Sequence, residues 1–141
     1  MEISNPVQIV ILTHGKWGLE LVESAELIIG KIEDVKVFSL MPRDSIETYT
    51  DRINTFINSM KGRKVLIMTD ILGGIPCQIA AIMAASWDNV SAINGLSLEM
   101  LLVTEKLRKK YPEKELVSEI IKESNKSILD IKQLFDSIEY S

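Results

Sequence analysis

Two residues in the sequence have the types and the placement that phosphoryl or acyl chemistry uses, one histidine and one aspartate. His14 is the only histidine among 141 residues, and it directly follows the β-branched, apolar run from Val7 to Thr13. Asp70 directly follows a similar run from Lys64 to Thr69. A carboxylate that accepts a hydrogen bond from one ring nitrogen fixes the tautomer and leaves the other nitrogen free as a nucleophile. The pair therefore indicates a histidine nucleophile oriented by an acid.

A glycine-containing segment soon after Asp70 could bind an anion. Glycines let a backbone approach a ligand closely, and the first turn of a following helix has unpaired N–H groups. The alternative is a tight turn that only needs flexible residues. An imidazole, an orienting carboxylate and an anion site together are typical of a phosphoryl acceptor, since phosphoryl transfer depends on positioning and charge stabilisation. The phosphoryl-binding residues predicted in this segment are Gly73, Gly74, Ile75 and Pro76.

Short β-rich segments alternate with longer amphipathic ones, and these elements must position the two residues. Strands are predicted over residues 7–13, 35–40, 64–69 and 89–94, and helices over residues 17–30, 43–62, 77–86 and 96–110. Asp44 and Glu47 are spaced as a capping box for the second helix, and a further helix begins at Glu113. The alternation indicates an α/β fold with a doubly wound open sheet, mainly parallel, in the order 2-1-3-4.

That strand order predicts where a site lies. Ligands of open parallel sheets bind beyond the carboxyl ends of the strands, at the point where the strand order reverses. The loops after the first and third strands then face one crevice, so His14 and Asp70 are expected at the same edge of the sheet. The alternatives are a capping or solvent-exposed ring for His14, and a helix cap or turn for Asp70.

The composition indicates a single domain over residues 1–141. The formal net charge of −4 disfavours a nucleic-acid partner, because phosphate backbones require a basic surface. We find no apolar run of the roughly 18–20 residues that span a bilayer, and no signal peptide. The single cysteine excludes an intrachain disulfide and suits a reducing compartment, so we expect a cytoplasmic protein.

Other chemistries are disfavoured by the residues present. One histidine and one cysteine do not make a typical zinc site, and neither a metal nor another cofactor is expected. The sequence has no Walker A motif, no G-x-G-x-x-G after the first strand and no G-x-S-x-G elbow. A response-regulator receiver domain shares this sheet but needs acidic metal ligands after the first strand, where this chain has Thr13 and His14.

Three segments resemble the IIA domain of mannose-family sugar phosphotransferase systems. They are VILTHGKWGLELVESAELIIG, VLIMTDILGGIPCQIAA and AINGLSLEMLLVTEKL. The T-H-G after the first strand and the T-D-x-x-G-G-x-P after the third are specific when they occur together. The resemblance implies a phosphotransferase component that takes a phosphoryl group from HPr on Nε2 of His14, while Asp70 holds Nδ1. It then passes the group to a histidine of the cognate IIB domain, which serves the membrane components IIC and IID.

The residues around His14 indicate where these partners dock, and one position of the loop departs from the family. A surface facing the partners is predicted at Gly15, Trp17 and Leu72, because large apolar side chains at a crevice rim suit a transient protein contact. The alternative for Trp17 is packing against its own helix. Ile75 stands where the family usually has serine. We expect altered transfer rates rather than loss of function, since backbone N–H groups can still bind the phosphoryl oxygens.

The family forms homodimers in which a C-terminal antiparallel strand crosses to the other subunit. Residues 127–131, SILDI, are the candidate for that strand, although residues 127–134 fit a helix or a strand. Similar IIA-like domains also occur attached to transcriptional activators or as a subunit that serves dihydroxyacetone kinase, where the phosphohistidine has a regulatory or supplying role. A non-catalytic small-molecule-binding module is a third possibility. The chain length favours a free-standing IIA domain that feeds a sugar transporter.

Overall fold

A parallel four-stranded sheet with the order β2-β1-β3-β4 forms the centre of the computed structural model, which describes residues 2–140. The predicted order is confirmed. Because Leu12 of β1 pairs with Thr69 of β3 in parallel register, the ends of these two neighbouring strands lie at one edge. The strands are β1 (Gln8–His14), β2 (Val35–Leu40), β3 (Val65–Thr69) and β4 (Val90–Asn94).

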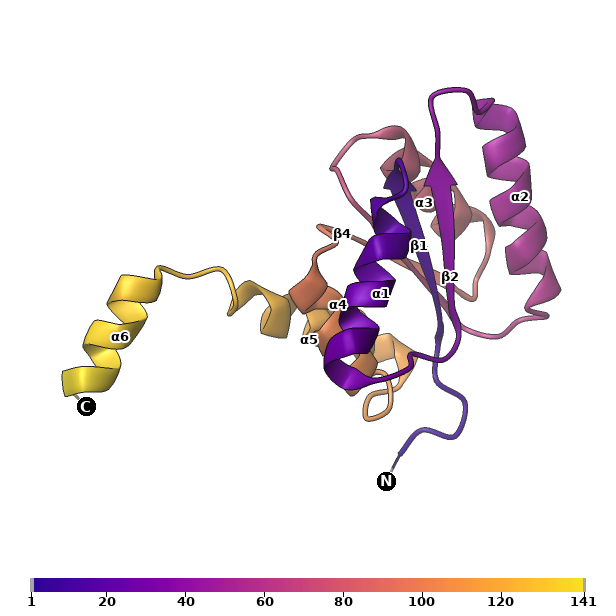
Figure 1. Cartoon of the computed structure of the whole chain (residues 1–141). Helices are drawn as coiled ribbons and strands as arrows, with labels where there is room; N and C mark the ends of the chain where they lie inside the picture. The colour runs from indigo at the N-terminus through magenta and orange to yellow at the C-terminus, as the bar shows by residue number, and fades with distance from the viewer. Residues whose placement is uncertain (1, 141) are drawn as a thin grey trace.

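Helices cover both faces of the sheet, as parallel strands buried on both sides require. Helices α1, α4 and α5 pack on one face, and α2 and α3 pack on the other (Figure 1). These assignments confirm the doubly wound α/β fold predicted from the alternation of segments. The helices are α1 (Trp17–Ile29), α2 (Ile46–Ser59), α3 (Ile75–Ser86), α4 (Leu98–Leu107), α5 (Glu113–Asn125) and α6 (Ile131–Tyr140).

Two hydrophobic cores lie on either side of the sheet, and β1 contributes alternate residues to both. Ile9 and Ile11 belong to the core under α1, α4 and α5, whereas Val10 and Leu12 belong to the core under α2 and α3. All four side chains are fully buried. The continuous apolar run in the sequence thus reflects burial on both faces, and it holds the end of β1 rigidly in place.

The start of α2 differs from the capping box predicted at Asp44. Ser45 is the N-cap: its backbone is extended, and its side chain accepts a hydrogen bond from the N–H of Thr48 at 3.2 Å. The Asp44 carboxylate accepts instead from the N–H of Met41 at 2.8 Å and closes the preceding turn. Both residue types cap helices well. Because the Asp44 carboxylate is already bonded within the turn, Ser45 caps the helix. The predicted start was therefore one residue too early.

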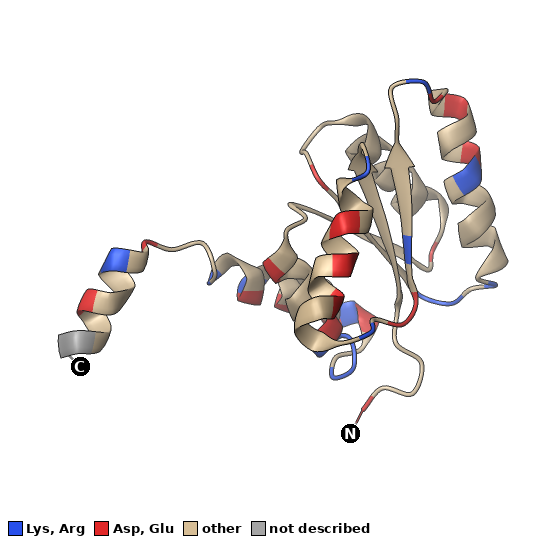
Figure 2. Cartoon of the chain, in the orientation of Figure 1, with Lys and Arg blue, Asp and Glu red and all other residues tan. Residues whose placement is uncertain are grey.

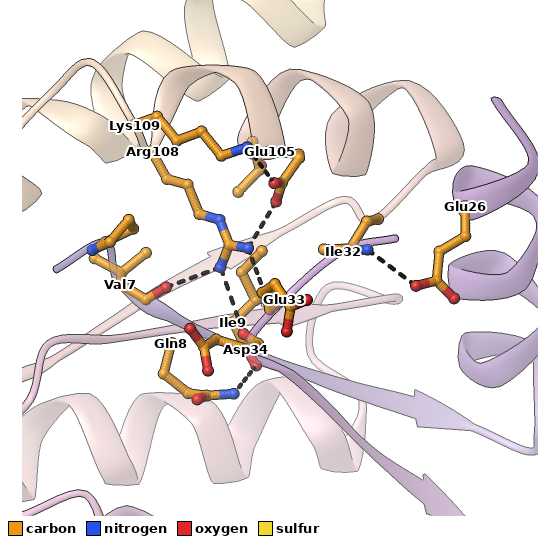
Figure 3. A network of polar contacts seen from close by, with 12 residues as sticks. Val7, Gln8, Ile9, Glu26, Ile32, Glu33, Asp34, Glu105, Arg108 and Lys109 are labelled. Carbon is orange, nitrogen blue, oxygen red and sulfur yellow. Dashed lines mark hydrogen bonds and ion pairs between the residues drawn. The ribbon is translucent and has the colours of Figure 1, made fainter. Parts of the chain in front are cut away.

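The side chain of Arg108, at the end of α4, holds several segments together at the amino edge of the sheet (Figure 3). This guanidinium is 3% exposed and forms an ion pair with Glu105 at 2.7 Å. It also donates to the main-chain carbonyls of Val7 at 3.0 Å and of Glu33 and Asp34 in the loop before β2. One side chain thus connects α4, β1 and the connection from α1 to β2 at the edge opposite to His14.

The C-terminal segment differs from the predicted antiparallel strand. Residues 128–130 form neither helix nor strand, α6 begins at Ile131, and α6 extends away from the rest of the chain (Figure 1). Within residues 2–140 the sheet has no fifth strand. In this single chain the segment pairs with neither of the edge strands, β2 and β4. No helix in the described part of the chain is long and apolar enough to cross a membrane.

Candidate functional site

His14 and Asp70 meet at the carboxyl edge of the sheet. His14 is the last residue of β1, and Asp70 follows directly after β3. The Asp70 carboxylate accepts a hydrogen bond from the main-chain N–H of His14 at 2.8 Å, and its oxygens lie 3.1 and 3.2 Å from the ring Nδ1. The Asp70 side chain is 4% exposed, whereas the His14 side chain is 41% exposed. The strand order therefore brings the two residues together and leaves the ring accessible.

Several donors surround the carboxylate of Asp70. Besides the two groups of His14, the N–H of Ile71 donates to Oδ1 at 2.9 Å and the indole N–H of Trp17 donates to Oδ2 at 3.3 Å. Burial raises the pKa of Asp70, but the hydrogen bonds from His14 and Trp17 outweigh it and hold that pKa below its usual value. Asp70 is therefore ionised at neutral pH.

This ionised neighbour determines the tautomer of His14. A carboxylate can only accept hydrogen bonds, so Nδ1 carries the proton and Nε2 keeps a lone pair. The Nε2 edge of the ring faces Gly74: a Cβ atom placed there would lie 3.3 Å from Nε2 and 2.8 Å from Cε1. Only glycine leaves room for the ring in this position. The nitrogen with the free lone pair is thus the one next to the start of α3.

The start of α3 can bind an anion beside Nε2. Gly74 is the N-cap, and no side chain of the described residues caps this end of the helix. N–H groups in the first turn of a helix lack intrahelical partners, and the helix dipole favours negative charge there. Ile75 can supply such a group. Pro76 has no N–H and is buried, so it shapes the first turn without donating.

Gly73 shapes the loop that leads into this helix. Its backbone has φ of +80°, a conformation that other residues adopt with strain. The side-chain amide of Gln78, one turn into α3, donates to the carbonyl of Gly73 at 2.9 Å. Gln78 is one of the residues that the sequence pattern did not single out, because an exposed glutamine in a helix gives no distinctive signal.

Asn94, at the end of β4, holds the loop that carries Asp70. With its NH2 group toward Thr69 and its oxygen toward the loop, the amide donates to Thr69 Oγ1 at 2.8 Å and to the carbonyl of Ile71 at 3.2 Å. Its oxygen accepts from the N–H groups of Leu72 and Gly95, both at 3.1 Å. A polar residue at the carboxyl end of a buried strand, like Asp70 itself, was the available signal for this position.

The rim of the site is mostly apolar and exposed. Leu72 is 82% exposed, Ile71 58% and Trp17 39%. Gly15 is half-buried, with φ of +71°, and its N–H donates to the carbonyl of Leu40 at 2.8 Å. Acidic residues lie instead along α1 (Figure 2). Among the described residues, no cluster of three histidine, cysteine, aspartate or glutamate side chains could hold a metal ion.

The fold and the site together define a class of protein: an open parallel α/β domain that presents one acid-oriented histidine beside the start of a helix. The family model EIIA-man, described as "PTS system fructose IIA component", matches residues 8–121, and the chain belongs to this family. The resemblance noted in the sequence is thereby confirmed. Members of this family are components of sugar phosphotransferase systems.

Individual relatives agree with this assignment. The chain is 27% identical over 128 residues to the mannose-specific EIIAB component of Escherichia coli K12. This match covers 89% of this chain but only 40% of that protein. It is 24% identical over 116 residues to the sorbose-specific EIIA component of Lacticaseibacillus casei, covering 82% of this chain and 84% of the relative. A crystal structure of a phosphotransferase system component EIIA from Streptococcus agalactiae superposes with a TM-score of 0.83 at 25% identity, covering 90% of this chain and 98% of that one.

Proposed function

We propose that this chain is a phosphocarrier of a sugar phosphotransferase system, which accepts a phosphoryl group on Nε2 of His14 from phosphorylated HPr and passes it to a histidine of a cognate IIB domain. The observation that carries the proposal is the arrangement around one ring. Asp70 lies against Nδ1, and the free Nε2 lies beside the uncapped start of α3. The family assignment supports the same function.

The first step follows from this arrangement. The lone pair on Nε2 attacks the phosphorus atom, the P–N bond to the donor breaks, and its electron pair returns to HPr. The proton on Nδ1 stays in place, so the phosphorylated ring is a cation that the carboxylate of Asp70 stabilises at about 3.1 Å. N–H groups at the start of α3, that of Ile75 among them, stabilise charge on the phosphoryl oxygens.

Ile75 changes this anion site relative to the serine that the family usually has. Its side chain has no hydroxyl, so backbone N–H groups alone serve the phosphoryl oxygens from this position. We expect transfer to proceed at an altered rate. Gly73 and Gly74 keep the backbone close enough for these contacts, and Pro76 holds the first turn.

The second step reverses the first with a different acceptor. A histidine nitrogen of the IIB domain attacks the phosphorus atom, and the P–N bond electrons return to Nε2. Two protein partners must in turn reach the ring, which its 41% exposure permits. Trp17, Leu72 and Gly15 at the rim form the surface that both partners contact. Because these partners and the indirect link to IIC and IID belong to a phosphotransferase system, we infer that the protein acts in the cytoplasm as a single domain.

Labelling with phosphorylated HPr tests the proposal. Radiolabelled phospho-HPr should transfer its label to the intact protein, and His14→Ala should abolish this transfer while the far-ultraviolet circular dichroism stays unchanged. Discharge of the labelled protein by a IIB domain distinguishes the transport function from a regulatory phosphohistidine. Labelling that persists in His14→Ala contradicts the proposal.

A further inference from the structure

We propose that Trp17 is a positioning residue of this site, whose indole N–H holds the carboxylate of Asp70 in place against His14. This inference rests on the function proposed above and deepens it. Trp17 is the first residue of α1, three positions after His14. Its Nε1 donates to Oδ2 of Asp70 at 3.3 Å. The bond joins the start of α1 to the loop after β3.

The bond from Trp17 affects His14 because both residues contact the same oxygen of Asp70. Oδ2 also accepts the main-chain N–H of His14 at 2.8 Å and lies 3.1 Å from the ring Nδ1. A third donor on the same oxygen stabilises the charged carboxylate relative to its protonated form. It also restricts rotation of the carboxylate away from the ring. Trp17 therefore acts on His14 through Asp70 and does not need to touch the phosphoryl group.

The backbone preceding α1 directs the indole toward Asp70. Gly15 has φ of +71°, which turns the chain sharply after β1, and Lys16 is the N-cap of the helix. Gly18 then allows α1 to approach the sheet closely, since a Cβ atom there would lie 3.0 Å from the side chain of Thr13. The indole is 39% exposed, so its ring can contact a partner while its N–H faces the carboxylate.

The two roles of the indole predict different responses to the loss of the N–H alone. Loss of the N–H raises the pKa of Asp70, because one of the donors that lower that pKa is gone. It also lets the carboxylate rotate away from the ring, so labelling should slow at neutral pH, where Asp70 is ionised with or without the bond. A ring that only contacts partners would keep both the rate and the pKa of Asp70 when the N–H is removed and the ring is retained. The titratable groups that face Asp70 are His14 of β1 and Tyr49 of α2, and burial followed by the charge of Asp70 raises the pKa of Tyr49.

The test replaces the N–H and keeps the ring. In a Trp87→Phe background, Trp17 is the only tryptophan, and it can be exchanged for benzothienylalanine, which has a sulfur atom in place of the N–H. We expect the rate of labelling by phospho-HPr at neutral pH to fall by about threefold to tenfold, as for the loss of one typical hydrogen bond. Trp17→Phe should show a loss at least as large.

Trp87→Phe is the matched control. The indole of Trp87 donates to Asn54 at 3.0 Å, on the other side of the molecule from α1, so this variant should keep the labelling rate of the parent protein. A carbon-13 titration of the Asp70 carboxyl group in the unphosphorylated protein should show the raised pKa of Asp70 without HPr. It tests the bond even if His14 proves not to accept phosphoryl groups. An unchanged labelling rate and an unchanged titration after loss of the N–H would overturn the inference.

Discussion

The carboxylate of Asp70 accepts the main-chain N–H of His14 at 2.8 Å and lies 3.1 Å from the ring Nδ1 of the same residue. One side chain thereby aligns the end of β1 and the plane of the imidazole. The two residues are 56 positions apart in the sequence and are neighbours only because β1 and β3 are adjacent and parallel. The alignment of the His14 ring therefore depends on the sheet itself.

Replacing Asp70 by asparagine should slow the phosphorylation of His14 by about 10- to 100-fold, the usual cost of losing the partner that orients a reactive histidine. Asparagine keeps the size of the side chain but removes the charge that stabilises the phosphorylated ring. The fold should remain, at a cost of about 1–3 kcal/mol in the free energy of unfolding. The rate of labelling by phospho-HPr and a urea titration measure the two effects. An unchanged rate would remove Asp70 from the mechanism.

Acid should destabilise the protein partly through Asp70. Its pKa is lower in the folded chain than in the unfolded chain, so it contributes stability that is fully present above the unfolded value of about 3.9. That contribution is lost as the pH falls through the folded pKa. The free energy of unfolding of Asp70→Asn should therefore fall less steeply below pH 4 than that of the parent protein. Equal slopes in urea titrations at several pH values would contradict this.

Replacing Gly74 by alanine should block phosphorylation with little effect on the fold. The new Cβ atom would lie 2.8 Å from Cε1 of His14 and must displace the ring. Gly62→Ala is the control, because Gly62 has φ of +85° with open space around it. That variant should lose roughly 1–2 kcal/mol of stability through backbone strain and keep its labelling by phospho-HPr. Normal labelling of Gly74→Ala would show that the ring is not confined there.

Arg108 should contribute strongly to stability and not to phosphoryl transfer. Arg108→Met leaves Glu105 without its buried partner and removes the donors to Val7 and Glu33, which should cost about 3–5 kcal/mol. Lys109→Met removes the exposed partner of the same carboxylate, at 3.0 Å, and should cost at most about 1 kcal/mol. Urea titrations compare the two. Similar losses in both variants would show that the buried network is not the stabilising element.

The C-terminal residues should determine the oligomeric state. The family resemblance predicts a homodimer, and α6 exposes Ile131, Leu134 and Phe135. We expect sedimentation to show a dimer for the intact chain and a monomer after deletion of residues 128–141, because apolar residues of α6 need a protein surface to cover them. Lys132→Ala should leave the dimer intact. A dimer that survives the deletion would place the interface elsewhere.

The residue pattern predicted the fold and the central pair of the site. Apolar runs such as the one before His14 indicate strands because their side chains are buried on both faces, which is a local property that periodicity reveals. The strand order then placed Asp70 at the same edge. The start of α2 was misplaced by one residue, since Asp44 and Ser45 can both cap a helix and only the geometry of the turn selects Ser45.

Two features were decided only by the tertiary structure. The bond from Trp17 to Asp70 and the amide of Asn94 against the loop both depend on groups that are distant in the sequence. A strand or a helix is encoded by nearby residues, because its hydrogen bonds and its periodicity are local. A side-chain hydrogen bond requires two atoms within about 3 Å in the right direction, and that placement exists only after the sheet and its helices have packed.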